Sequence, residues 1–145
     1  MSVVVPTVFS MTDRDGRVGA PGAGVPIDLS AVVAALGSIE ATAGDDAARC
    51  ELITLLETLT CAATGAQAAL AVDLKASQVA AQAAAGTPVA RQGAGVAAMV
   101  GLARRESVHR GTFHLGLAEL VVRDLPHVAA AWRAGRVSEF RVQKI

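Results

Sequence analysis

Residues 46–85 read DAARCELITLLETLTCAATGAQAALAVDLKASQVAAQAAA, a stretch without proline that contains a single glycine, Gly65. Asp45 and Asp46 stand at its start, where carboxylates can accept the free amides of a first helical turn. Leucine and alanine then recur every three or four residues, as in a helix that packs lengthwise on a partner. We call this set the leucine seam; its members are Leu52, Leu56, Leu59, Ala63, Ala66 and Leu70. The stretch predicts one long helix that ends at the breakers in residues 86–88.

An unbroken helix of this size would be about 60 Å long, which exceeds the width of a compact domain built from a chain of 145 residues. We therefore expect the helix either to kink near Gly65 or to protrude. A protruding leucine seam could also pair with another chain. Self-association would then involve Leu52, Leu56, Leu59 and Leu70.

The composition favours closely packed helices on either side of this stretch. Hydrophobic residues make up 52% of the chain but aromatic residues only 3%, so the core must consist of alanine, leucine and valine. Capping residues and breakers predict shorter helices near residues 30–43, 96–106, 107–125, 126–134 and 138–145. The predicted fold is an all-α helical bundle. It comprises a flexible N-terminal arm (1–27), rich in Gly and Pro, and a helical domain (28–145) in which one long Ala/Leu-rich helix precedes several shorter ones.

Charge is unevenly distributed along the chain, although the net charge is zero. Residues 1–90 contain four basic residues against nine acidic ones, and residues 91–145 contain nine basic residues against four acidic ones. A basic half of this kind is typical of a surface that meets a polyanion. The alternative is that the two halves simply pair with each other.

Sites for metals and cofactors are not expected. His109 and His114 are five residues apart and so do not share a helical face, which favours capping or surface roles over a metal pair. Cys50 and Cys61 lie on one predicted helix, too far apart to form a disulfide, and we expect two buried thiols in a cytoplasmic protein. The GAGVAA segment at residues 93–98 lacks the preceding strand of a dinucleotide site. No catalytic residue, cofactor or membrane-spanning segment is assigned.

The end of the chain has the pattern of a helix-turn-helix. A predicted helix from Pro126 is followed by a Gly-Arg-Val turn at residues 135–137, a capping Ser138 and a further helix. Four basic residues surround it: Arg133, Arg136, Arg141 and Lys144. The pattern permits DNA contact, but any two helices joined by a tight glycine turn share it. Trp132, beside an alanine run, is expected to anchor the core rather than to stack on a base.

Four short segments carry a family resemblance: LARR (102–105), SVHRG (107–111), LPHVAA (125–130) and GRVSE (135–139). In this order they resemble the core motif of the domain of unknown function 222, or 13E12 repeat, family. The resemblance covers about the last 45 residues. It implies a helical region of the kind that typically precedes an HNH endonuclease domain, and hence a nucleic-acid setting.

The chain departs from the family pattern at two places. Val108 stands where the family usually has proline, a small change at a helix start. The chain also ends within the helix after GRVSE, so the nuclease motif is missing, and we expect a truncated, non-catalytic copy.

The function expected from these features is nucleic-acid binding or positioning. The residues expected to make contact are Arg104, Arg105, His109, Arg110, Arg133 and Arg136. Two alternatives stay open: a helical protein-protein interaction or assembly module, and a truncated gene copy without an independent function.

Overall fold

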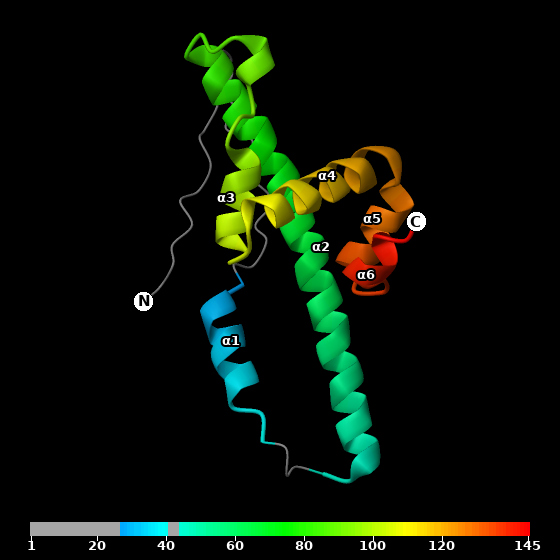
Figure 1. The fold of residues 1–145 in the computed structure, drawn as a ribbon. Helices are drawn as coiled ribbons and strands as arrows, with labels where there is room; N and C mark the ends of the chain where they lie inside the picture. Colours follow the sequence, from blue (N-terminus) through cyan, green and yellow to red (C-terminus); the bar gives the residue numbers. More distant parts are fainter. Residues whose placement is uncertain (1–26, 41–43) are drawn as a thin grey trace, which may run out of the picture. The chain divides into compact units, whose positions relative to one another are not determined.

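The computed structural model describes residues 27–40 and 44–145, and within these ranges it contains helices and no strand (Figure 1). The all-α prediction is confirmed. Contacts divide the chain into two units, Met1–Gly44 and Asp45–Ile145, whereas the sequence suggested a boundary at residues 27–28. Apart from Ile27, the predicted N-terminal arm lies outside the described residues.

The first unit contains the helix α1, Leu29–Gly37. Asp28 caps it, because its carboxylate accepts hydrogen bonds from the amides of Ser30 and Ala31 at 3.0 and 3.1 Å. The helix is shorter than expected, since it ends before Ser38 rather than near Gly44.

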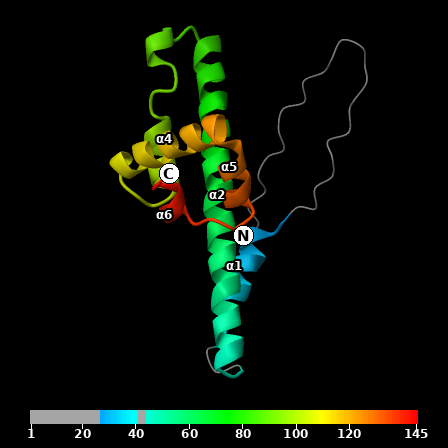
Figure 2. The ribbon, with the colours of Figure 1, turned by 90° about the vertical axis from the view of Figure 1, so that its right-hand side faces the viewer.

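The second unit is built on α2, Asp46–Ala84, a single helix of 39 residues. Asp45 caps it by accepting a hydrogen bond from the Ala48 amide at 2.9 Å. The helix runs unbroken through Gly65, and its first part extends beyond the helices α3–α6 of the same unit (Figures 1 and 2). Of the two expected outcomes, protrusion is therefore the one observed.

The predicted shorter helices follow in order: α3 (Val96–Ala103), α4 (Val108–Asp124), α5 (Pro126–Arg133) and α6 (Glu139–Val142). A 3-10 turn that was not predicted, η1 (Val89–Arg91), lies between α2 and α3. Ser107 and Ser138 cap α4 and α6 by accepting from the amides of Arg110 and Arg141. Helix α4 crosses α2, and α5 runs beside α2 (Figures 1 and 2).

The core of this unit contains two adjoining groups of buried side chains. The first is Ala68, Ala118, Val121, Trp132 and Val142, and the second is Ala71, Val96, Val100 and Leu115. Trp132 is 2% exposed, so its predicted role as a core anchor is confirmed. The expectation of two buried cysteines is wrong for Cys50, which is exposed, and correct for Cys61.

Small residues decide which helix faces meet. An added Cβ on Gly65 would lie 2.8 Å from the backbone nitrogen of Arg133, so α2 and α5 touch at their backbones. On α4 the buried face contains Gly111 and Ala118, whereas the larger Phe113 and Leu120 are 39% and 46% exposed. Helix faces that approach this closely must bear small side chains, and the larger apolar residues lie beside them.

Candidate nucleic-acid interface

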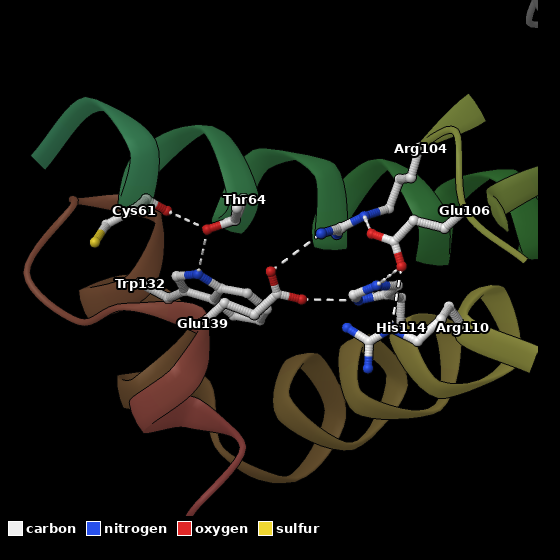
Figure 3. A network of polar contacts seen from close by, with 8 residues as sticks. All are labelled: Cys61, Thr64, Arg104, Glu106, Arg110, His114, Trp132 and Glu139. Carbon is white, nitrogen blue, oxygen red and sulfur yellow. Dashed lines mark hydrogen bonds and ion pairs between the residues drawn. The ribbon is translucent and has the colours of Figure 1, made fainter. Parts of the chain in front are cut away.

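The C-terminal half of the chain is organised around one buried histidine, His114, on α4 (Figure 3). Its ring nitrogens face two carboxylates from different parts of the chain. Nε2 lies 2.9 Å from Oε2 of Glu106, and Nδ1 lies 2.8 Å from Oε1 of Glu139. The first contact has the geometry of a hydrogen bond. The second is equally short but is not aligned as one, so these two atoms are in contact without sharing a directed bond.

Arg104, at the end of α3, completes this group. Its Nη2 donates to Oε2 of Glu139 at 3.1 Å, and its Nε lies 3.6 Å from Oε1 of Glu106. Its side chain is only 15% exposed. We call Arg104, Glu106, His114 and Glu139 the buried ionic cluster. The cluster joins the end of α3, the inner face of α4 and the first turn of α6.

Glu106 receives several donors at once. Its Oε2 accepts from Nε of Arg110 at 3.1 Å as well as contacting His114. The hydrogen bond to His114 is the main reason why the pKa of Glu106 is lowered, with a further contribution from Arg110, while burial acts in the opposite direction. Glu106 therefore retains its charge at acid pH values at which an ordinary glutamate begins to bind a proton.

A second polar contact fixes α5 to α2. The indole Nε1 of Trp132 donates to Oγ1 of Thr64 at 3.0 Å, and the same hydroxyl donates to the carbonyl oxygen of Cys61 at 2.9 Å (Figure 3). The only nitrogen of the Trp132 side chain is thus satisfied inside the core.

The expected contact residues fall into two classes. Arg104 is turned inward to the buried ionic cluster, and Arg110 is tied to Glu106 while its guanidinium lies 5.0 Å from the Phe113 ring centroid. The other four are exposed and have no ion pair within the described residues; these are Arg105, His109, Arg133 and Arg136. The outward-facing subset is therefore smaller than the sequence indicated.

Arg105 has an unusual backbone conformation. It is the residue after the α3 C-cap and has a φ of 59°, which lies in the left-handed region. Where a helix ends with a residue in this conformation, that residue is usually glycine. The amide of Glu106 donates to the carbonyl of Gly101 at 2.8 Å, and the amide of Arg105 donates to that of Leu102 at 3.0 Å. These bonds form a Schellman motif with arginine at its glycine position. An exposed arginine is thus held where glycine would be less strained.

The two basic segments predicted separately are brought together. Residues 104–110 and 133–141 meet through the 3.1 Å pair between Arg104 and Glu139, whose positions differ by 35. Sequence reasoning missed Glu106 and Glu139, and it gave His114 a capping or surface role, which is wrong because His114 is 5% exposed. Neither acid stands out along the chain, because residues 91–145 also contain Glu119 and Asp124.

Two cavities border these residues. One, of about 180 Å³, is mostly apolar and reaches Arg104, His114 and Glu139 from α2 and α3. The other, of about 400 Å³, lies between the first half of α2 and the turn that joins α5 to α6. No group of three His, Cys, Asp or Glu side chains in the described ranges is placed to hold a metal ion.

Helix α2 is long and apolar enough to cross a bilayer by length and composition. That test does not separate a membrane span from the central helix of a bundle. Here α3, α4, α5 and α6 all pack against α2.

Comparisons with protein-family models, with curated proteins and with solved structures find no match.

Proposed function

We propose that this chain is a non-catalytic helical domain of an HNH-endonuclease-associated repeat protein and that it binds or positions nucleic acid. The resemblance of residues 102–145 to the 13E12 repeat family supports the setting. One structural observation carries the binding proposal: exposed arginines of this region face solvent without a carboxylate partner in the described chain. They are Arg105, Arg133, Arg136 and Arg141.

Unpaired arginines matter because an arginine that is already bound to a carboxylate must break that ion pair before it can bind a phosphate, which weakens the binding. Arg104 and Arg123 are so held, by Glu139 and Asp124. Guanidinium groups without such partners can bond phosphate oxygens directly, and such contacts position a protein without reading sequence. We therefore propose binding that is sensitive to salt and tolerant of sequence.

The position of Arg105 supports this proposal independently. Glycine would relieve the left-handed backbone at this residue, so an arginine there is costly for the fold. A contact made by its side chain would account for the strain.

Fluorescence anisotropy with a labelled DNA duplex tests the proposal. Affinity should fall linearly with salt on a logarithmic plot, with a slope of roughly 0.9 for each phosphate contacted. An R105A/R133A variant should bind more weakly and show a shallower slope. R123A/R91A is the control, since it removes the same charge from other exposed positions. Absence of binding at low salt, or an affinity that ignores salt, would refute the proposal.

The second candidate function is assembly through the leucine seam. In support of it, Leu52, Leu59 and Leu70 are 37%, 42% and 67% exposed along one helix. Exposed apolar residues arranged in this way are typical of an interaction surface.

Sedimentation velocity over a range of concentrations tests assembly. We expect association in the wild type and a monomer for L59E/L70E. The control is L102E, which alters an 80% exposed leucine outside the seam. A wild-type monomer at every concentration would exclude assembly, and a dimer that does not bind DNA would favour it over the first proposal.

A further inference from the structure

The cavity of about 400 Å³ has two arginines on its wall. It lies between the first half of α2, at Thr58 and Cys61, and the α5–α6 segment that carries Arg136 and Arg141. We call it the arginine groove. Among the described residues that line it, Glu57 is the only acid.

The turn that carries Arg136 is held firmly against α2. Gly135 has a φ of 73°, and a Cβ added to it would lie 2.6 Å from the carbonyl oxygen of Thr58. The amide of Arg136 donates to the carbonyl of Ala131 at 3.0 Å and closes the end of α5. The backbone of Arg136 is therefore fixed at the rim of the groove, because only glycine fits the position before it.

Helix α6 fixes the second arginine by a different route. Glu139 is bound to Arg104 on the inner side, and Val142 is 3% exposed in the core. Arg141 follows Glu139 by two residues, which rotates it about 200° around the helix axis. The ion pair that anchors Glu139 thus directs Arg141 away from the buried ionic cluster and toward the groove.

The charges around the groove favour an anion. Neither Arg136 nor Arg141 has an ion pair within the described ranges, and the one nearby carboxylate, Glu57, accepts a hydrogen bond from Sγ of Cys61 at 3.4 Å. Burial is the main reason why the pKa of Cys61 is raised, Glu57 adds to the effect, and the positive charge of Arg141 opposes it. The positive charge of Arg141 therefore reaches the Cys61 thiol in the wall of the groove.

We infer that the arginine groove binds one phosphate group of a nucleic-acid backbone, held between the guanidinium groups of Arg136 and Arg141. Guanidinium forks match phosphate oxygens in geometry and remain charged at every physiological pH. This inference rests on the proposed nucleic-acid function and specifies where the backbone lies. Glu57 is placed to weaken the contact by repulsion.

DNA titrations of single-charge variants test the inference. R136A and R141A should each weaken binding by about five- to ten-fold at low salt and lower the salt slope by about 0.9. The matched control is R91A, an exposed arginine beyond the other end of α2, about 40 Å along the helix from Thr58. It should change the affinity by less than about two-fold. E57Q should tighten binding without lowering the slope, a gain that misfolding cannot produce.

The outcomes separate this inference from the function on which it rests. If the wild type binds DNA and R136A and R141A behave like R91A, the groove is not the site although the function stands. If the wild type does not bind DNA, the proposed function fails. Titration with inorganic phosphate, followed by NMR shifts of the arginine Nε–H groups, then decides the groove alone. If phosphate shifts these signals in the wild type but not in R136A, the groove binds free phosphate and the phosphate site stands. If phosphate causes no shifts in the wild type, the inferred phosphate site is refuted.

Discussion

Arg104 and Glu139 form a 3.1 Å ion pair between the end of α3 and the first turn of α6, with both side chains about 15% exposed. This pair brings the two basic segments of the chain into one structure. It also determines on which side of α6 the remaining residues lie.

Removing one member of this pair leaves the other charge in a poorly solvated place. R104A and E139A should each reduce the free energy of unfolding by about 2–3 kcal/mol. In a double-mutant cycle the losses should be non-additive by more than about 1 kcal/mol, measured by urea denaturation. Additive losses would contradict the structural role given to the pair. As a reference, R123A, which disrupts an exposed pair, should cost clearly less than either R104A or E139A.

Two glycines of α4 should respond oppositely to the same substitution. A Cβ on Gly111 would overlap the carbonyl oxygen of Ala97, so G111A should destabilise the protein by about 3 kcal/mol or more. Gly116 has open space around its Cβ position, and G116A should stabilise the helix by about 0.5–1 kcal/mol. Thermal unfolding of both variants measures these changes in stability. If G111A and G116A change the stability equally, the close approach of α3 and α4 is refuted.

Glu106 makes stability depend on acid pH. Because its folded-state pKa lies below the ordinary value of 4.5, its contribution is complete above that pH and is lost as the pH falls through the folded-state pKa. E106Q should therefore flatten the decline of the melting temperature below about pH 5. E51Q, at an exposed position of α2, should leave the profile as in the wild type. An unchanged profile in E106Q would show that other groups cause the acid sensitivity.

The hydrogen bond between Trp132 and Thr64 can be removed at nearly constant volume. T64V leaves the buried indole N–H without an acceptor and should cost about 1–3 kcal/mol. T64S keeps the hydroxyl and should cost clearly less. Trp132 is the only tryptophan, so its fluorescence reports both unfolding and the local environment. A loss in T64S as large as that in T64V would contradict this, because the missing methyl group would then cost as much as the missing hydrogen bond.

Arg105 should show opposite effects on stability and binding. R105G relieves the left-handed backbone and should raise the free energy of unfolding by about 0.5–1 kcal/mol, while it weakens DNA binding. R105A removes the same charge without relieving the strain, so it should weaken binding without the gain in stability. If R105G binds DNA as the wild type does, the strain at this residue has no role in binding.

Local signals predicted the helices well. Asp28, Asp45, Ser107 and Ser138 cap helices because each side chain bonds amides two or three residues away, a relationship contained in the sequence itself. The length of α2 followed from the absence of breakers. The early end of α1 did not, because marginal helices depend on packing that a local pattern does not contain.

The buried ionic cluster was beyond such signals. Glu106, His114 and Glu139 meet only when α3, α4 and α6 are packed, and no spacing along the chain reports that. Hydrophobicity alone also does not identify the inner face of α4. Phe113 is strongly apolar but stays 39% exposed, since the close crossing with α3 requires Gly111 at the point of contact.

The contact face of α2 consists of Cys61, Gly65, Ala68 and Ala71, side chains that are already at or near the smallest size available. Such a face has almost nothing to lose by truncation and can fail only by enlargement. An alanine scan would therefore be nearly silent at Cys61, Ala68 and Ala71, and it would detect this face only at Gly65, where the added Cβ would clash with the backbone of α5. Saturation mutagenesis would find the reverse, a narrow band of positions that reject almost every larger residue.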